Sequence, residues 1–137
     1  PVFANGDIDS PASAAAVIAD TGAAGVMIGR AAQGKPWLCG QIAVHLDTGV
    51  TPPDPSREQQ LAIMQDHVMA LHEFYGEYMG LRIARKHVSW YLQDYTNHLQ
   101  HRRAFNQLEQ ASDQLNYLHQ MTETYPYQNT LQKEKAA

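Results

Sequence analysis

Apolar residues in the first fifty positions form short runs that alternate with a helical pattern. Residues 2–4 and residues 24–28 are two such runs, and each ends in polar and glycine residues. Between them an alanine-rich segment begins at Ser10-Pro11, a typical N-cap and first helical position, and ends at Gly22. The pattern predicts a buried strand, a helix and a second buried strand, and therefore a βαβ unit with parallel strands.

A second helix is predicted from Pro36 to about Asp47, closed by Gly49. Because parallel sheets are buried on both faces, and two strands leave two unpaired edges, this part of the chain needs further βα units beside it. We therefore interpret residues 1–50 as α/β structure, the last part of a barrel or of a doubly wound sheet.

The pattern changes after residues 51–55, a proline-rich segment that is typical of a linker between domains. Ser56 and Gln59 have the spacing of a capping box, and apolar residues then recur at helical spacing as far as Gly76. A further helix is predicted over about residues 81–95.

An a/d-type seam over residues 104–122 predicts one more helix, or two with a break near Ser112. Residues 56–125 are thus expected to form a small helical bundle. Residues 126–137 are polar and contain Pro126, and we expect them to form a flexible tail.

The overall composition is typical of a globular protein, with 44% apolar and 18% charged residues. No apolar run is long enough to span a membrane. The first residues have no secretory signal pattern, so we expect a chain that starts inside a larger fold. The single cysteine, Cys39, excludes an internal disulfide and suits a reducing compartment. It has no evident base partner, and the seven histidines complete no metal-ligand pattern, so we predict a packing cysteine and no metal site.

The net charge of −4 conceals one basic region. Residues 78–105 carry five basic side chains and one acid, Asp94, whereas the rest of the chain is acidic. On a helical wheel Arg82, Arg85 and Lys86 share one arc, and the opposite arc is apolar. Such a face is expected either to contact a phosphate backbone or to be a solvated surface that balances acidic helices nearby. The residues alone leave both interpretations open. The other two basic side chains of the region, Arg102 and Arg103, lie just beyond this face together with His98 and His101.

Both predicted strands end in glycine with a polar partner. Asn5-Gly6-Asp7 follows the first strand and Gly29-Arg30 follows the second. Parallel strands place their carboxyl ends at one edge, where α/β proteins bind phosphates, so we expect the two segments to converge on one site. The alternative is ordinary turn chemistry, for which Asn-Gly-Asp is also well suited.

Four motifs, taken in this order, resemble the C-terminal portion of a bacterial tRNA-dihydrouridine synthase, closest to the B-type subfamily. They are Ala-Asn-Gly-Asp-Ile at residues 4–8, Met-Ile-Gly-Arg-Ala-Ala-Gln-Gly with Pro-Trp at 27–37, His-Glu-Phe-Tyr-Gly at 72–76, and Arg-Ile-Ala-Arg-Lys-His-Val-Ser-Trp-Tyr at 82–91. The resemblance extends to about residue 120.

The resemblance implies an FMN-binding TIM barrel followed by a helical domain. Residues 1–50 would supply the seventh and eighth barrel strands with their helices, and residues 56–125 the tRNA-binding domain. The residues expected to bind FMN, chiefly at its phosphate end, are Asn5, Gly6, Asp7, Gly29 and Arg30. The residues expected to contact tRNA are Arg82, Arg85, Lys86 and His87.

The activity implied is that of a cytoplasmic oxidoreductase, which reduces the C5–C6 bond of a uridine in tRNA with FMN recharged by NADPH. The family's proton-donating cysteine lies earlier in the barrel, so no catalytic residue is assigned here, and Cys39 is not that acid. We expect this chain alone neither to bind FMN well nor to turn over. Two alternatives are a stand-alone helical RNA-binding module and a different phosphate-binding barrel enzyme with a helical oligomerisation tail.

Overall fold

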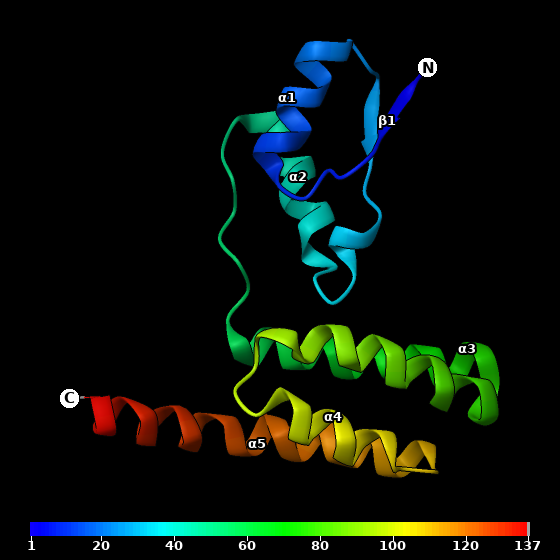
Figure 1. Cartoon of the computed structure of the whole chain (residues 1–137), viewed down its shortest axis with the longest axis vertical. Coiled ribbons are helices and arrows are strands. Elements are labelled where there is room, and N and C mark those ends of the chain that lie inside the picture. The colour runs from blue at the N-terminus through cyan, green and yellow to red at the C-terminus, as the bar shows by residue number, and fades with distance from the viewer. Residues whose placement is uncertain (137) are drawn as a thin grey trace. The chain divides into compact units, whose positions relative to one another are not determined.

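The computed structural model describes the backbone of residues 1–136 and the side chains of residues 1–124. The chain divides into two compact units, Pro1–Asp54 (unit 1) and Pro55–Ala137 (unit 2) (Figure 1). Unit 1 contains strands and helices, whereas unit 2 is helical over its described residues. Among those residues, no helix combines the length and the apolar character that crossing a membrane requires.

Unit 1 begins with the predicted βαβ arrangement. Strand β1 (Phe3–Asn5) and strand β2 (Gly25–Met27) pair in parallel, with Asn5 opposite Met27, and helix α1 (Pro11–Thr21) connects them. The start of α1 confirms the expected cap, since the Ser10 hydroxyl accepts a hydrogen bond from the backbone N–H of Ser13 at 3.2 Å.

The core of unit 1 lies where α1 and helix α2 (Trp37–Thr48) pack together. Its buried side chains are Ile8, Ala14, Leu38 and Ile42. The expectation of buried strands is wrong for the ends of the sheet, because Val2, Phe3 and Met27 are 74%, 62% and 59% exposed. Two strands cannot cover each other's faces, so these apolar side chains remain open, as expected for a parallel unit that needs further structure beside it.

Cys39 also differs from its prediction as a packing residue, because its side chain is exposed. On α2 the buried positions are Leu38, Gln41 and Ile42, which lie three and four residues apart. Position 39 therefore falls on the solvent side of the helix.

Unit 2 begins with helix α3 (Arg57–Tyr91), whose two halves are separated by a sharp turn. The capping box of Ser56 and Gln59 is present at its start. Gly76 has a left-handed φ of 74° and a non-helical ψ of 171°, so the first half ends there, as the sequence predicts, and the chain turns. Just beyond the turn, a Cβ on Gly80 would lie 2.9 Å from the Cα of His72, and glycine thus permits the close approach of the two halves.

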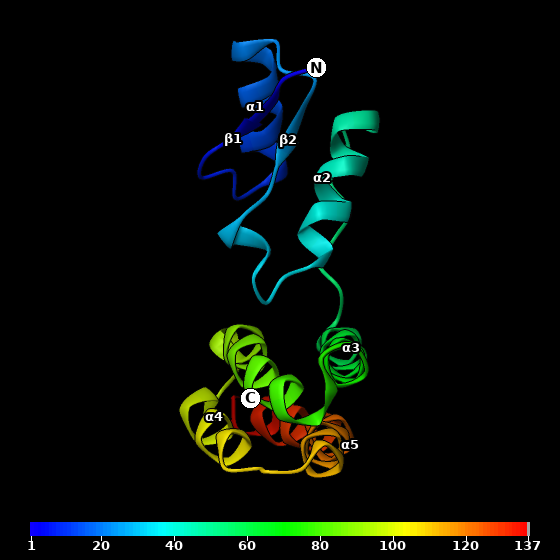
Figure 2. The ribbon, with the colours of Figure 1, turned by 90° about the vertical axis from the view of Figure 1, so that its right-hand side faces the viewer.

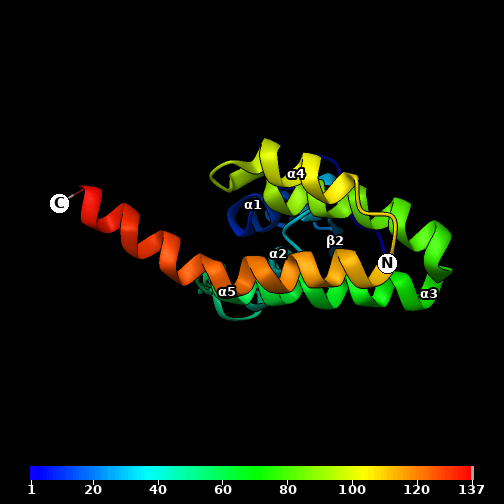
Figure 3. The same ribbon diagram turned by 90° about the horizontal axis from the view of Figure 1, so that it is seen from below.

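A short 3-10 helix, η2 (Leu92–Asp94), leads into helix α4 (His98–Asn106), and α5 (Ala111–Ala136) follows. Figures 2 and 3 show α5 alongside the first half of α3 and α4 alongside the second half. The predicted seam over residues 104–122 is therefore two helices, with the break at residues 107–110 rather than near Ser112. The buried side chains of unit 2 with the largest volumes are Phe105, Leu61, Met64, Leu92, Leu118, Gln114, Val68 and Val88.

Helix α5 also continues through residues 126–136, where the sequence predicts a flexible tail. The residues after Pro126 include Leu131, Gln132, Lys133, Glu134 and Ala136. These are strong helix formers, which favour continuation of the helix over an irregular segment.

Candidate functional site

The two predicted strand-end segments border one cleft in unit 1. The cleft has a volume of about 820 Å³, and its lining includes all five residues predicted to bind a phosphate-bearing cofactor. Those five residues are Asn5, Gly6, Asp7, Gly29 and Arg30. We call this space the strand-end cleft.

The parallel register explains why the two segments meet. Asn5 and Met27 are opposite each other at the ends of β1 and β2, so the residues that follow them leave the sheet at the same edge. Arg30 begins the short 3-10 helix η1 (Arg30–Ala32), and its Nη2 lies 2.7 Å from Oδ1 of Asp7. Both side chains are more than four-fifths exposed, so the ion pair adds little to the stability of unit 1. Its effect is to hold the Arg30 guanidinium beside Asp7.

The backbone of the strand-end cleft is open to a ligand. Gly6 has a φ of +135°, a conformation that other residues rarely adopt. A Cβ on Gly6 or Gly29 would meet no heavy atom within 4 Å. An exposed guanidinium beside such backbone is suited to a phosphate, because arginine donates paired, charge-assisted hydrogen bonds to phosphate oxygens.

Met27 also lines the strand-end cleft, and the sequence analysis did not single it out. Met27 is the last residue of β2 and is followed by Ile28 and Gly29, and 59% of its surface is exposed. Its position at the carboxyl end of a strand is the signal that could have identified it.

Two of the residues predicted to contact tRNA are exposed on the second half of α3. Arg82 donates a hydrogen bond from Nη1 to the Tyr78 hydroxyl at 2.7 Å, and the Lys86 ammonium lies 5.2 Å from the centre of the Trp90 ring. Each contact spans one turn of the same helix. Because both side chains are exposed, their positive charges are available to a phosphate.

Arg85 is half-buried and has a structural contact. Its Nη2 donates to the backbone carbonyl of Leu108 at 2.9 Å, which ties α3 to the segment between α4 and α5. Its Nε is buried and has no hydrogen-bond partner within the described part of the chain. Arg85 therefore stabilises unit 2 besides adding charge to this side of α3.

His87, the fourth residue predicted to contact tRNA, lies in a half-buried aromatic cluster. Its ring centre is 4.7 Å from that of His67 and 5.1 Å from that of Trp90. Burial lowers the pKa of His87, and the neighbouring His67 and Lys86 lower it further. At neutral pH His87 therefore presents a neutral ring, and the positive charge of this region comes from the arginines and Lys86.

His67 in the same cluster is held by Tyr91. The His67 Nδ1 lies 2.9 Å from the Tyr91 hydroxyl. Burial lowers the pKa of His67 and raises the pKa of Tyr91 to about 12, so both groups are neutral around pH 7 and the phenol can donate to the ring nitrogen. A similar contact joins α4 to α5, where the His101 Nδ1 is 2.8 Å from the Tyr117 hydroxyl.

We expect unit 2 to lose stability as the pH falls below the ordinary histidine pKa of 6.5. Because folding lowers the pKa of His67 and His87, the unfolded chain binds more protons than the folded chain in this range. The stabilisation that comes from the two neutral histidines is complete above pH 6.5. It is lost as the pH falls through the lowered pKa values of His67 and His87 in the folded chain. Urea unfolding at about pH 7.5 and about pH 5.5 measures the difference. His67→Gln should reduce this difference in the free energy of unfolding, whereas His98→Gln, at an exposed position, should leave it unchanged. If the unchanged chain and both variants show the same pH dependence, His67 is not a source of it.

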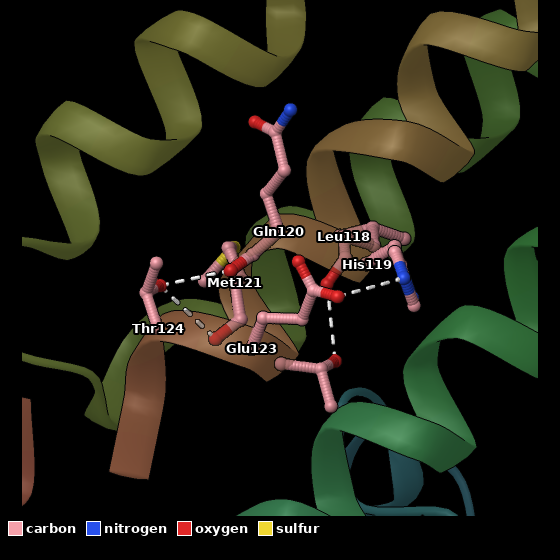
Figure 4. Close-up of polar contacts among 7 residues, drawn as sticks. Leu118, His119, Gln120, Met121, Glu123 and Thr124 are labelled. Carbon is pink, nitrogen blue, oxygen red and sulfur yellow. Dashed lines mark hydrogen bonds and ion pairs between the residues drawn. The ribbon is translucent and has the colours of Figure 1, made fainter. Parts of the chain in front are cut away.

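Within the described residues there is no group of three or more histidine, cysteine, aspartate or glutamate side chains that could hold a metal ion. On α5, for example, His119 Nε2 pairs with Glu123 Oε1 at 3.3 Å, one turn along the same helix (Figure 4). The neighbouring Thr124 hydroxyl donates to the Gln120 carbonyl at 2.9 Å, so the polar contacts drawn there are local to the helix.

The chain belongs to the dihydrouridine synthase family, whose family model, described as "Dihydrouridine synthase (Dus)", matches residues 1–126. The prediction of this family from the four motifs is confirmed.

Three proteins named tRNA-dihydrouridine synthase B are among its relatives. That of Proteus vulgaris is 53% identical over 126 residues, and that of Escherichia coli (strain K12) is 52% identical over 126 residues; each match covers 91% of this chain and 39% of the relative. That of Yersinia pestis is 54% identical over 119 residues, which are 86% of this chain and 37% of the relative. The chain thus spans about two fifths of the length of these relatives.

Proposed function

We propose that this chain is part of a flavin-dependent tRNA-dihydrouridine synthase, in which unit 1 supplies two FMN-binding loops and unit 2 binds tRNA. The observation that carries the proposal is the meeting of Asn5-Gly6-Asp7 with Gly29-Arg30 in one cleft, in a chain of the dihydrouridine synthase family. The reaction is the reduction of the C5–C6 double bond of a uridine in tRNA. In this proposal NADPH is the reductant, and the enzyme is located in the cytoplasm.

In this proposal β1 and β2 are the seventh and eighth strands of a TIM barrel. Two features support it: the strands are parallel with a helical crossover, and they leave Val2, Phe3 and Met27 exposed. A barrel would place the strand-end cleft at the carboxyl end of its strands, where barrel enzymes bind phosphates with the loops after the last two strands.

The residues of the strand-end cleft fit FMN. Its volume of about 820 Å³ lies within the range of about 300–1,000 Å³ that is usual for ligand sites. Arg30 would hold the phosphate group, with Asp7 keeping the guanidinium at the cleft, and the open backbone at Gly6 and Gly29 would allow close approach. When bound in its reduced form, FMN supplies the hydride for the uridine ring.

Unit 2 is proposed to bind the tRNA backbone through the exposed charges of Arg82 and Lys86 on α3. A uridine inside a folded tRNA must leave its stack to be reduced, and enzymes that act on such bases need contacts that hold the surrounding nucleic acid. No residue of this chain is proposed as the proton donor, and Cys39 is not among the residues that line the strand-end cleft.

A chimera tests the proposal, with the 126 matched residues of the E. coli relative replaced by those of this chain. We expect the chimera to form dihydrouridine in tRNA, measured by mass spectrometry of digested nucleosides. The isolated 137-residue chain should form none and should purify without flavin absorbance. A folded chimera that forms no dihydrouridine would contradict the proposal, and flavin bound by the isolated chain would contradict the assignment of only part of the FMN site to it.

A further inference from the structure

A small pocket lies on unit 2, beside the turn at Gly76. Its volume is about 350 Å³, and four of its lining residues come from the second half of α3 and one from the segment before α5. They are Tyr78, Leu81, Arg82, Arg85 and Glu109. Two guanidinium groups against one carboxylate give this lining a net charge of +1.

Tyr78 and Arg82 lie next to each other in the lining of this pocket, and we call this pair the Tyr78–Arg82 platform. Tyr78 is 72% exposed, yet its hydroxyl accepts a hydrogen bond from Arg82 at 2.7 Å. The Arg82 guanidinium carbon lies 5.3 Å from the centre of the Tyr78 ring. Aromatic rings and arginine planes are the surfaces on which unpaired RNA bases stack.

The backbone around the platform is held in place by the turn. Gly76 reverses the chain two residues before Tyr78, and Gly80 brings the two halves of α3 into close contact two residues after it. On the other side, Arg85 is fixed to the Leu108 carbonyl. A binding surface fixed in advance loses less conformational entropy when a ligand binds.

We propose that this pocket binds one unpaired nucleotide of the RNA. Its base stacks on the Tyr78–Arg82 platform, and its phosphate contacts the positive charge of Arg82 and Arg85. A volume of about 350 Å³ is at the lower end of the range for ligand sites and suits a single nucleotide. This inference rests on the proposed function, because it presumes an RNA substrate. Beyond RNA binding by unit 2, the pocket implies that unit 2 distinguishes unpaired from paired RNA.

The test uses the full 137-residue chain and two fluorescent RNA probes with equal numbers of phosphates, a single-stranded oligouridylate and a perfect duplex. Stacking of one base contributes enough that Tyr78→Leu should weaken binding of the single strand about tenfold. Binding of the duplex should stay within about twofold. Tyr78→Phe keeps the ring and should retain most of the affinity. Phe74→Leu is the matched control, since Phe74 is 81% exposed but outside the pocket.

Salt dependence separates stacking from charge. Tyr78→Leu should leave the slope of log affinity against log salt unchanged, whereas Arg82→Gln should reduce it by about one. If Tyr78→Leu binds both probes like the unchanged chain while Arg82→Gln weakens both, the nucleotide pocket is wrong and the proposed RNA-binding function stands. If the unchanged chain binds neither probe nor tRNA, both proposals are wrong.

Discussion

Reversing the charges of Arg82 and Lys86 together is expected to weaken tRNA binding on the order of 100-fold at low salt. This corresponds to about 1.4 kcal/mol for each side chain, as two phosphate contacts are replaced by repulsion. Both side chains are exposed, and their contacts with Tyr78 and Trp90 stay within one helix, so the fold should be retained. Fluorescence anisotropy with labelled tRNA measures the affinity, and circular dichroism checks the fold.

The control for this variant is Arg30→Glu with Lys35→Glu, which makes the same change of net charge on unit 1. It should weaken tRNA binding by less than about threefold if the attraction is local to unit 2. The double variant on α3 should also keep the oligomeric state of the unchanged chain. Unchanged tRNA affinity together with a lost oligomer would contradict the proposal and indicate that this face of α3 is an interface between chains.

Phe105→Ala is expected to destabilise unit 2 by about 3–5 kcal/mol, a large part of the stability of an ordinary domain. The Phe105 side chain has no exposed surface, and its ring centre lies 6.1 Å from that of Tyr117 on α5. Truncation would leave a cavity where α4 joins the rest of the bundle. Urea unfolding followed by circular dichroism measures the change in free energy of unfolding.

Leu99→Ala on the same helix is the matched control for Phe105→Ala. Leu99 is 55% exposed, so its truncation should change the free energy of unfolding by no more than about 0.5 kcal/mol. Equal effects of the two substitutions would show that α4 does not pack on the bundle through Phe105.

Local features of the fold could be predicted from the sequence because nearby residues determine them. The cap at Ser10 and the capping box at Ser56 involve side chains three residues apart, and the turn at Gly76 needs a residue that tolerates a positive φ. The convergence of the two strand-end segments was also predictable, because it follows from the parallel pairing of β1 with β2.

The features that sequence analysis missed depend on contacts between distant residues. Gln114 is a polar residue on α5, yet it is fully buried between His72, whose Nε2 lies 2.8 Å from its Oε1, and the Leu81 carbonyl. These partners are 42 and 33 residues away, so no local pattern indicates them. The hydrogen bond from Arg85 to Leu108 is of the same kind, and it explains why a residue on the predicted basic arc is half-buried.

We propose that Arg30, held by Asp7 at 2.7 Å, binds the phosphate end of FMN. The most direct test is the flavin content of the chimera with the E. coli relative, measured by absorbance per protein after dialysis. Arg30→Ala should raise the dissociation constant for FMN about 10- to 100-fold, since it removes a charge-assisted contact of about 1.5–3 kcal/mol. Lys35→Ala, which removes a positive charge outside the strand-end cleft, should leave the flavin content unchanged. Full flavin content in the Arg30→Ala chimera would contradict the claim.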